Sequence, residues 1–257
     1  MLLEQFDTNK VAVFNPDTFQ KEIKGFPKTA MSIFEKELIA DIEKNYEVQQ
    51  IATIKSMTKD YPVYKVTVDG RDIAIYQTPV GAAAAVGIFE EMIVMGTKNL
   101  LLVGCCGCLD STIEDYSIII PTSALRDEGT SYHYMPASDE VKIDTKCVSV
   151  IEEFIKAKKI SYNKGKTWTT DGLYRETKDK VEMRKKQGAI TVDMECSAMA
   201  AVAKFREVNF GQFFYAADNL GAEEYAARSL AIKGITDGKK KIVPLAIECA
   251  VEMDRKL

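Results

Sequence analysis

Side chains able to bind ligands or transfer protons follow four apolar runs of this sequence. Carboxylates, guanidinium groups and thiols occur there, and carboxylates accept hydrogen bonds from hydroxyl groups and act as general acids or bases. In α/β sheets, ligands bind where strands end and loops begin. We therefore expect these segments to meet at one ligand site. In chain order they are residues 103–109, 126–134, 192–195 and 216–219.

Three of the six cysteines crowd around a glycine, as Cys105, Cys106 and Cys108 beside Gly107, and the other three are scattered. This is not the spacing of a disulfide framework, so we expect reduced thiols. A zinc site built on the CxxC pair would need two further ligands, and the only histidine is His133. We expect no metal; the segment instead predicts a turn whose small residues let the backbone approach a ligand.

The elements that must position these residues alternate between strand and helix patterns. Asp69-Gly70 predicts a tight hairpin turn, and Gly81 and Gly96 mark the two ends of an apolar helix. The predicted fold class is α/β, with a mixed, twisted central sheet flanked by helices. We expect strands over 29–34, 63–68, 73–77, 99–103, 116–120, 189–192 and 210–217, and helices from residue 35 and over 82–95, 194–205 and 242–253.

Composition narrows the class of protein. A chain of 257 residues that is 46% hydrophobic and 28% charged can bury one large core, so we expect a single domain over residues 1–257. The formal net charge of -4 leaves no basic excess for binding nucleic acid. No long apolar run opens the chain, which argues against a secretory signal or a membrane anchor. We expect a cytoplasmic protein that binds neither nucleic acid nor membrane.

Five pieces of the sequence form a series whose order and spacing are informative. Three of them are residues 80–85 with Glu90, Glu91 and Gly96, then residues 103–107, then residues 126–131. The fourth is Val-Asp-Met-Glu at 192–195, and the fifth is Asp218. Over most of its length the chain thereby resembles the nucleoside phosphorylase family, which includes uridine phosphorylase, hexameric purine nucleoside phosphorylase and methylthioadenosine nucleosidase.

The resemblance implies roles in breaking a glycosidic bond, a reaction that builds positive charge on the sugar and negative charge on the departing base. The Val-Asp-Met-Glu piece is similar to the family's ribose-binding Val-Glu-Met-Glu. Glu195 would accept hydrogen bonds from two sugar hydroxyls, Met194 would pack on the sugar, and His133 would reach a sugar hydroxyl. Asp218 would donate a proton to the base, with Arg228 as a partner engaged when a loop closes.

Ordinary structural roles remain open for the same side chains. Asp193 and Glu195 would favourably charge the first turn of a helix in any protein. Asp218 could cap a helix that starts near Ala222. A histidine between two tyrosines, as at His133, is often simple packing.

The resemblance also implies a base pocket. Uridine-specific members read the pyrimidine with a glutamine and an arginine, and residues 170–177 lack the glutamine. Together with Asp218, this favours a purine. Tyr174 and Arg175 of this segment could line the base pocket or could simply lie on an exposed loop. The candidate base-binding residues are Cys106, Gly107, Tyr174, Arg175 and Asp193.

The phosphate site departs most from the family pattern. The Gly-Asp-Pro-x-Arg loop expected after the first strand is replaced by residues 32–36, and Leu102 stands where an arginine would precede Val103-Gly104. Backbone amides could still cradle an anion. The two cationic candidates have structural alternatives. Lys36 could be a solvated lysine on an exposed helix face, and Arg126 could belong to a structural ion cluster. The candidate phosphate-binding residues are Lys36, Gly104, Cys105 and Arg126.

We expect a nucleoside phosphorylase that takes inorganic phosphate as co-substrate, needs no cofactor, and converts a nucleoside, preferably of a purine, into free base and pentose 1-phosphate. Water could replace phosphate, with Glu35 placed to activate it. The substrate could instead be uridine, or the chain could bind nucleosides without turnover. The resemblance further implies a homo-oligomer, a dimer or a trimer of dimers, whose interface the atypical N-terminal segment 1–28 could alter.

Overall fold

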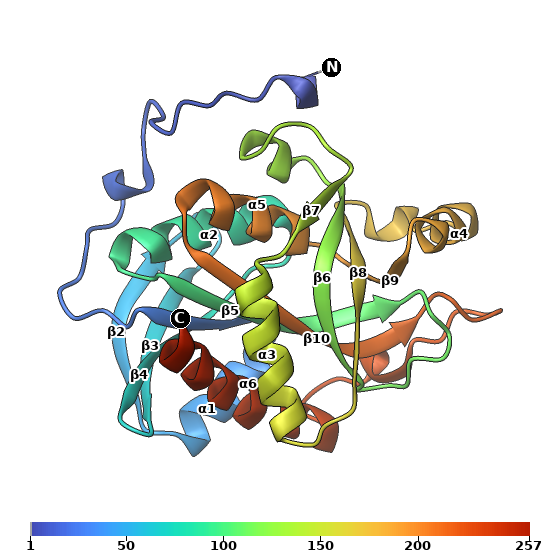
Figure 1. Ribbon diagram of the computed structural model, residues 1–257. Helices are drawn as coiled ribbons and strands as arrows, with labels where there is room; N and C mark the ends of the chain where they lie inside the picture. Colours follow the sequence, from blue (N-terminus) through green and yellow to red (C-terminus); the bar gives the residue numbers. More distant parts are fainter. Residues whose placement is uncertain (1) are drawn as a thin grey trace.

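A mixed sheet of ten strands forms the centre of the molecule, and helices cover both of its sides (Figure 1). The computed structural model describes residues 2–257. Helices α2 (Ala82–Met95) and α5 (Cys196–Arg206) pack together on one side, and α1 (Lys36–Asn45), α3 (Thr145–Ala157) and α6 (Asp237–Lys256) lie on the other (Figure 1). The predicted α/β class with a mixed central sheet is therefore confirmed.

Strands and one further helix complete the inventory of regular elements. Helix α4 (Lys178–Lys186) stands apart at one end of the sheet (Figure 1). The strands are β1 (Thr29–Ile33), β2 (Val48–Lys55), β3 (Asp60–Val68), β4 (Arg71–Gln77), β5 (Asn99–Cys108), β6 (Ile118–Asp127), β7 (Glu140–Lys142), β8 (Tyr162–Thr170), β9 (Ala189–Asp193) and β10 (Asn209–Asn219).

Five of these strands close into a ring, and the others extend it. β10 pairs with β5 and β6, β6 with β8, β8 with β9, and β9 with β5. β1 pairs with β5 and carries β4, β3 and β2 outward, while β7 is added to β6. Closing the strands in this way brings the ends of strands that are distant in sequence close together.

One edge of β5 has a short stretch between its pairings with β1 and β9, which we call the open edge. β1 pairs with β5 only as far as Val103, and β9 begins its pairing at Gly107. β10 pairs with β5 along this whole stretch, with one irregularity between Ala216 and Asp218. Among the strands of residues 2–257, none pairs with residues 104–106 on the β1 side. Backbone groups on this edge are therefore available to a ligand.

Local turn chemistry agrees with the sequence patterns. Asp69 and Gly70 join β3 to β4 with φ of 51° and 73°, the two positive angles that a tight hairpin turn requires. Gly81 and Gly96 flank helix α2 with φ of 100° and 138°, which a residue with a side chain rarely adopts. Both the hairpin and the helix bounds were predicted correctly.

The predicted strand ends were wrong in three places. Residues 104–108, 126–127 and 218–219 lie inside β5, β6 and β10, beyond the predicted ends of these strands. The turn expected at Gly107 is absent, because β5 continues through it, paired with β10 and β9. The helix considered near Ala222 does not form either, and Asp218 is a strand residue. Small residues have little strand propensity of their own, so pairing with neighbouring strands decided these elements.

The N-terminal segment runs over the outside of the domain before β1 begins (Figure 1). Its single-turn helix Pro16–Thr18 lies against α2, and another, Leu2–Glu4, lies near the short helix η3 (Thr130–His133). Its effect on subunit contacts stays a prediction. Several of its apolar side chains are exposed: Leu2, Val11, Val13, Phe14 and Phe19.

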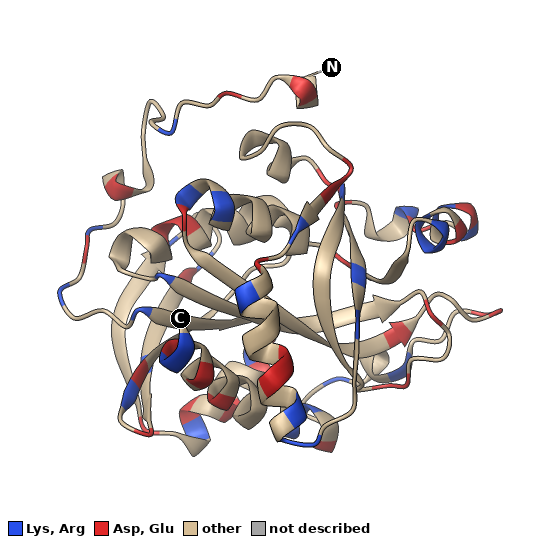
Figure 2. Ribbon diagram, viewed as in Figure 1, with Lys and Arg blue, Asp and Glu red and all other residues tan. Residues whose placement is uncertain are grey.

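Charged side chains of both signs are interspersed over the surface. Helices α4 and α6 each carry Lys and Arg as well as Asp and Glu (Figure 2). Within residues 2–257, no helix is both long enough and apolar enough to cross a membrane.

Candidate active site

Asp193 is a fully engaged carboxylate at the junction of β9 and α5. Its Oδ1 accepts hydrogen bonds from the hydroxyls of Thr167 and Thr169 at 3.0 and 2.8 Å. Its Oδ2 accepts from the backbone N–H groups of Glu195 and Cys196 at 2.9 and 2.6 Å. Protein donors thus occupy both oxygens. This geometry supports a role in holding the start of α5 and not the base contact predicted for Asp193.

Glu195 is buried but sparsely partnered. Its side chain reaches away from its own helix, and Oε1 accepts a hydrogen bond from the backbone N–H of Gly81 at 2.6 Å. Burial and the adjacent charge of Asp193 raise the pKa of Glu195 to about 8. Within residues 2–257, no Lys or Arg forms an ion pair with it. A buried carboxylate with so few donors retains acceptor capacity for the hydroxyls of a ligand.

The half-buried thiol of Cys105 is influenced by the charges of several acids. It lies on the open edge of β5, and burial raises its pKa to about 12. The negative charges of Glu35, Asp218 and Glu195 add to this rise. These groups come from the start of α1, the end of β10 and the start of α5. The charges of acids on three separate elements therefore act on this one thiol.

Asp218 packs directly against the backbone of β5. A Cβ atom at Gly107 would lie 3.2 Å from Asp218 Oδ1 and only 2.5 and 2.9 Å from Leu220 and Val192. Glycine is thus required for the acid to approach this strand. Burial raises the pKa of Asp218, and a hydrogen bond with Tyr225 opposes the rise. A carboxyl group that tends to stay protonated is what a general acid needs.

Arg228 lies near Asp218 without pairing with it. Its positive charge is felt by Asp218, where it lowers the pKa. Its Nη1, however, donates to the backbone carbonyl of Ile113 at 2.8 Å, and within residues 2–257 no ion pair links it to the acid. Its backbone has a φ of 42°, an uncommon conformation for a residue with a side chain. The partnership on loop closure therefore stays a prediction.

A cavity of about 740 Å³ extends outward from Asp218. Residues after β10 form one wall, and α4 with the residues preceding it forms the other. Tyr174 lines its rim and is otherwise exposed, whereas Arg175 is exposed and is not part of the lining. Such a cavity is large enough for a nucleobase. It is lined by Leu173, Tyr174, Glu176, Lys178, Val181, Glu182, Asp218, Leu220, Gly221, Ala222, Glu223, Tyr225 and Leu230.

The wall after β10 is fixed by a tight loop. Asn219 and Ala226 exchange two backbone hydrogen bonds that close it. The N–H groups of Leu220 and Gly221 both donate to the carbonyl of Cys108. A Cβ atom at Gly221 would lie 1.9 Å from the carbonyl oxygen of residue 109, so only glycine lets the loop approach β5 this closely.

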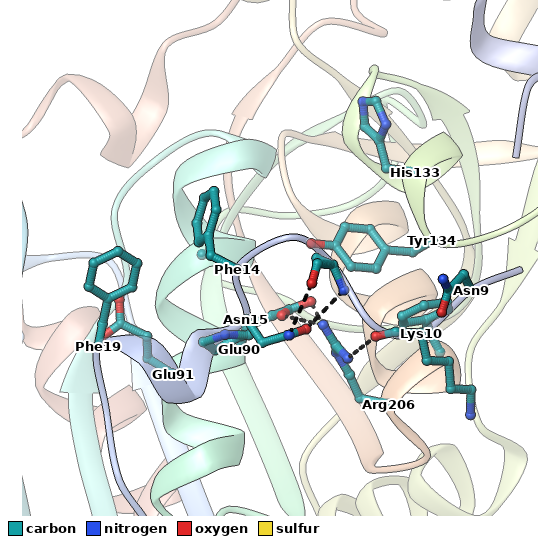
Figure 3. Close-up of a pocket in the computed structure, with 14 residues that line it drawn as sticks. Asn9, Lys10, Phe14, Asn15, Phe19, Glu90, Glu91, His133, Tyr134 and Arg206 are labelled. Atoms are coloured by element: carbon teal, nitrogen blue, oxygen red, sulfur yellow. Dashed lines mark hydrogen bonds and ion pairs between the residues drawn. The ribbon is translucent and has the colours of Figure 1, made fainter. Parts of the chain in front are cut away.

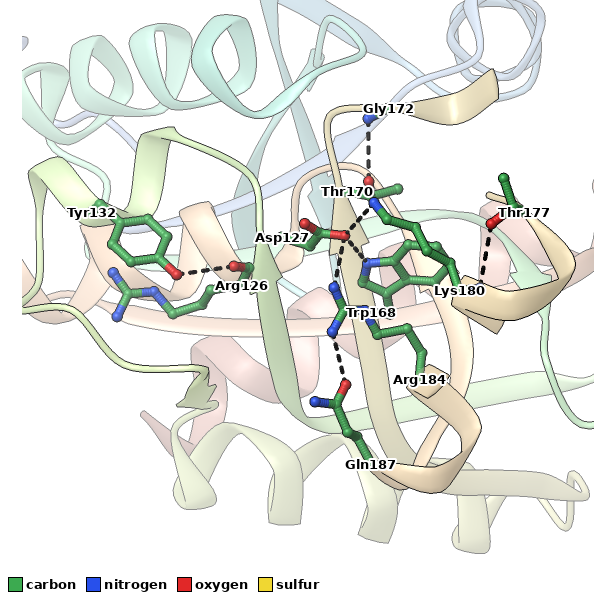
Figure 4. Close-up of polar contacts among 10 residues, drawn as sticks. All are labelled: Arg126, Asp127, Tyr132, Trp168, Thr170, Gly172, Thr177, Lys180, Arg184 and Gln187. Atoms are coloured by element: carbon green, nitrogen blue, oxygen red, sulfur yellow. Dashed lines mark hydrogen bonds and ion pairs between the residues drawn. The ribbon is translucent and has the colours of Figure 1, made fainter. Parts of the chain in front are cut away.

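Asp127, at the end of β6, holds in place the opposite wall of the cavity, which α4 forms (Figure 4). Asp127 Oδ2 accepts hydrogen bonds from Trp168 Nε1, Lys180 Nζ and Arg184 Nη2, at 3.0, 3.1 and 3.0 Å. The two cations, which belong to α4, also lie over the indole ring. One carboxylate thus ties α4 to β6 and β8, and the position of α4 sets the width of the cavity.

A second charged group occupies the edge of the site beside β1. Glu35 accepts a hydrogen bond from the hydroxyl of Tyr215 through Oε1 and from Lys239 Nζ through Oε2, the latter at 2.7 Å. Lys239 lies in the first turn of α6 and is only 8% exposed. The pair places one buried cation and one carboxylate next to Cys105.

Neither cationic candidate for phosphate binding is free in the site. The side chain of Lys36 is 80% exposed and lies 4.0 Å from Glu37, as in the alternative of a solvated lysine. Arg126 is buried, and its guanidinium donates to Ser131, Ser138 and the backbone carbonyls of Met135 and Pro136. Arg126 therefore holds the segment after β6 together. This geometry does not support a phosphate contact for either residue.

The remaining candidates on β5 and beside it differ in access. A Cβ atom at Gly104 would lie 2.7 Å from the ring of Phe34, so this residue packs under an aromatic side chain. Cys106 is buried, and its thiol is hydrogen-bonded to that of Cys108. Met194 is half-buried next to Glu195. Among residues 2–257, no group of three or more potential metal ligands is clustered, and all six cysteines are free.

His133 lies in a different pocket, under the N-terminal segment (Figure 3). This pocket, of about 390 Å³, is also lined by Phe14, Phe19 and Glu90. Glu90 is held there by two hydrogen bonds from Arg206, which is a structural ion pair. Within one chain His133 does not line the cavity of Asp218. A contact between His133 and a sugar, in its own or another subunit, stays a prediction.

Sequence reasoning did not identify four side chains that shape the site: Glu176, Tyr215, Tyr225 and Lys239. Glu176 and Tyr225 line the cavity, and the other two hold Glu35. Lys239 lies among three consecutive lysines, Lys239 to Lys241, which resemble a solvated helix face. Only the period of α6, which buries one of the three, could have singled it out.

Comparisons with known proteins place this chain in a family. The family model described as "Phosphorylase superfamily" matches residues 29–241, most of the chain, so the chain belongs to that superfamily. The match begins at the first residue of β1. The resemblance to the nucleoside phosphorylase family is thereby confirmed.

Individual relatives include enzymes named for purine and for pyrimidine nucleosides. Guanosine phosphorylase of Halorubrum lacusprofundi is 25% identical over 171 residues, 65% of this chain and 69% of its own. The structure of a purine nucleoside phosphorylase of Toxoplasma gondii in complex with immucillin-H has a TM-score of 0.78 at 17% identity, covering 91% of this chain and 94% of its own. A uridine phosphorylase of Vibrio fischeri has a TM-score of 0.76 at 20% identity, covering 92% and 95%. At these identities the two structures show a shared fold.

Proposed function

We propose that this protein is a nucleoside phosphorylase that cleaves the N-glycosidic bond of a purine nucleoside. The observation that carries the proposal is the arrangement around Gly107 of β5: β10 pairs Asp218 with it, β9, which leads to Glu195, pairs Val192 with it, and a cavity of about 740 Å³ opens beside Asp218. Membership of the phosphorylase superfamily supports it, as does the similarity to a protein named guanosine phosphorylase.

The two acids have complementary tasks in this chemistry. Glu195 accepts hydrogen bonds from the sugar hydroxyls, and these donors favour its ionised form. Its negative charge then stabilises the positive charge that develops on the pentose. Asp218, whose pKa is raised by burial, donates its proton to a ring nitrogen of the departing purine. A pyrimidine lacks the imidazole nitrogen that such an acid would protonate, which favours purines.

Phosphate, the proposed nucleophile, finds one buried cation and free backbone groups at the open edge. The charge of Lys239 acts on Cys105, and Lys239 takes the role for which Lys36 and Arg126 were considered. Phosphate would share Lys239 with Glu35. The expected products are free base and pentose 1-phosphate, and no further cofactor is required.

Hydrolysis is the second candidate, and Glu35 favours it. A carboxylate beside Cys105 repels an anion but can accept a proton from an attacking water. Tyr215 and Lys239 fix both of its oxygens, so its orientation is set before a substrate binds.

Incubation of the protein with a panel of nucleosides, with and without phosphate, tests the proposal. Purine base together with pentose 1-phosphate, formed only when phosphate is present, is the expected result. Free pentose formed without phosphate would show that the reaction is hydrolysis and not phosphorolysis. Binding of nucleosides without either product would contradict cleavage altogether, and preferred cleavage of uridine would contradict the assignment to purines.

We also propose a homo-oligomer. The exposed Val11, Val13, Phe14 and Phe19 of the N-terminal segment support it, because a cluster of exposed apolar side chains is suited to contact with a second chain. Light scattering coupled to size-exclusion chromatography tests this proposal, and a monomeric mass would overturn it.

A further inference from the structure

Glu35 brings a negative charge to the part of the site where the proposed function places an anion. It follows β1, whose pairing with β5 ends at Ile33 and Val103. On the other side of β5, Tyr215 of β10 pairs with Cys105, and its hydroxyl donates to Glu35 Oε1. The carboxylate therefore lies close to the open edge of β5, and its charge acts on the Cys105 thiol.

Glu35 and Lys239 retain hydrogen-bonding capacity although they pair with each other. Glu35 Oε2 accepts from Lys239 Nζ at 2.7 Å, and Oε1 accepts from Tyr215. A carboxylate offers about four acceptor positions, so about two of them remain available. Within residues 2–257, Glu35 is the only acceptor hydrogen-bonded to Nζ of Lys239, which has further N–H donors. The pair can thus receive a ligand that accepts from the ammonium and donates to the carboxylate.

Tetrahedral oxyanions differ in whether they can meet both conditions. At neutral pH, inorganic phosphate and arsenate keep an O–H group, whereas sulfate and selenate are fully ionised. Phosphate and arsenate can therefore donate a hydrogen bond to a carboxylate while their other oxygens accept from a cation. A fully ionised anion places its negative charge against the carboxylate with no proton between them, which is repulsive.

We propose that Glu35 selects oxyanions that carry a proton, such as phosphate, and rejects sulfate. This inference rests on the proposed function, in which phosphate attacks the sugar beside the open edge of β5. An O–H group of phosphate donates to Glu35, and Lys239 donates to another oxygen of the same phosphate. The carboxylate that would otherwise repel the co-substrate thereby recognises it.

The surroundings of the pair favour strong discrimination. The side chains of Glu35 and Lys239 are only 23% and 10% exposed, so water and salt screen their charges weakly. Among residues 2–257, Lys239 is the only cation that forms an ion pair with Glu35, and Lys36, the next residue in the chain, is 80% exposed. A sulfate ion would therefore meet a poorly screened carboxylate and a cation that is already paired.

Binding of four anions to the natural protein, measured by calorimetry at constant ionic strength, tests this inference without any variant. Phosphate and arsenate should bind with similar Kd values. Sulfate and selenate, which have the same tetrahedral shape, should bind at least about 100-fold more weakly, because a site built to receive an O–H group rejects an analogue that lacks it. A Kd for sulfate close to that for phosphate would overturn the inference.

The variant E35Q tests whether Glu35 causes the selection, with E37Q as the matched control. Glu37 lies in the first turn of α1, is 39% exposed and lies 4.0 Å from Lys36. An amide carries no charge and donates as well as accepts. We therefore expect the Kd of E35Q for sulfate to come within about tenfold of its Kd for phosphate, whereas E37Q should select as the natural protein does. An E35Q protein that still rejects sulfate would overturn the role of Glu35.

Assays of nucleoside cleavage separate this inference from the proposed function. Phosphorolysis that sulfate inhibits as strongly in the natural protein as in E35Q would overturn the role of Glu35 alone. Selective binding of phosphate over sulfate without phosphorolysis of any nucleoside would overturn the proposed function and leave the selection by Glu35 supported. Hydrolysis of nucleosides by a protein that does not bind phosphate would overturn both.

Discussion

The two halves of the site treat their charged groups in opposite ways. Beside β1, both oxygens of Glu35 are engaged by Tyr215 and Lys239, so the protein itself satisfies this carboxylate. Beside α4 and α5, the acids Glu195 and Asp218 are buried with few donors. Buried polar groups are normally satisfied by the protein itself. The contrast teaches that the second half lacks what a nucleoside would supply: hydroxyl donors for one acid and a basic nitrogen for the other.

Asp193 shows the same distinction over a span of three residues. It accepts four hydrogen bonds from the protein, whereas Glu195, two positions later, reaches across to Gly81. Sequence alone does not separate the two, because both acids precede the same helix. The engaged acid positions the helix, and the sparsely engaged acid is left for the ligand.

The largest effect is expected from E195Q. We expect a roughly 100- to 1000-fold loss of kcat/KM, because the variant loses the charge that stabilises the sugar in the transition state. The exposed Glu47, changed to Gln, serves as the control and should keep full activity. An E195Q protein with unimpaired kcat/KM would remove Glu195 from the site.

The same variant should be more stable at alkaline pH. The pKa of Glu195 is raised from 4.5 to about 8, so between these values the folded protein binds more protons than the unfolded chain, and stability falls as pH rises through this window. Glutamine carries no such penalty. We expect the Tm of E195Q to exceed that of the natural protein by a few degrees near pH 9 and by little near pH 5, as measured by calorimetry. Equal Tm values at both pH values would contradict the burial of an unpaired acid.

The second largest effect is expected from D218N. An amide cannot deliver a proton to the base, so kcat should fall roughly 100-fold for purine nucleosides. The decline of kcat at high pH, caused by ionisation of Asp218 in the natural protein, should disappear in the variant. If D218N kept that decline, the general acid would have to be sought elsewhere.

Substitutions in the half of the site beside β1 should weaken binding of phosphate and leave binding of the nucleoside unchanged. We expect K239Q to raise the KM for phosphate by about tenfold, with the Kd for the nucleoside unchanged, because the variant loses the buried cation. The adjacent and exposed Lys240, changed to Gln, is the control. Loss of nucleoside binding in K239Q with an unchanged KM for phosphate would mean that the two halves are assigned the wrong way round.

The smallest effect is expected from D127N, which acts through the wall of the cavity. The variant weakens three hydrogen bonds that hold α4, at a cost of about 1–2 kcal/mol because two of the partners are partly exposed. We expect a several-fold higher KM for the nucleoside and a nearly unchanged kcat. A fall in kcat with no change in KM would place Asp127 closer to the chemistry than the structure does.

Local patterns predicted the elements that depend on local chemistry. The hairpin at Asp69-Gly70 and the helix between Gly81 and Gly96 follow from backbone angles that few residues other than glycine adopt. The extension of β5 through Gly107 was not predictable in the same way. It depends on pairing with β10, whose residues lie about a hundred positions further along the chain.

The residues of the candidate site show the same difference between local patterns and contacts that are distant in sequence. Glu195 and Asp218 stand in short pieces of sequence that resemble a family pattern, so they were found without coordinates. Lys239 meets Glu35 across 204 positions, and Glu176 meets Asp218 only because α4 folds back over the end of β10. The surroundings of Arg126 were not predictable for a related reason: sequence shows that a guanidinium is present but not that nearby carbonyls and hydroxyls already bind it.

A crystal structure of the protein with a bound purine C-nucleoside, whose carbon–carbon bond to the sugar cannot be cleaved in this way, would test the central claim most directly. Glu195 should lie within hydrogen-bonding distance of the sugar hydroxyls and Asp218 beside the imidazole part of the base, with the ring in the cavity next to α4. A nucleoside bound elsewhere, or bound without contact between its sugar and Glu195, would contradict the account.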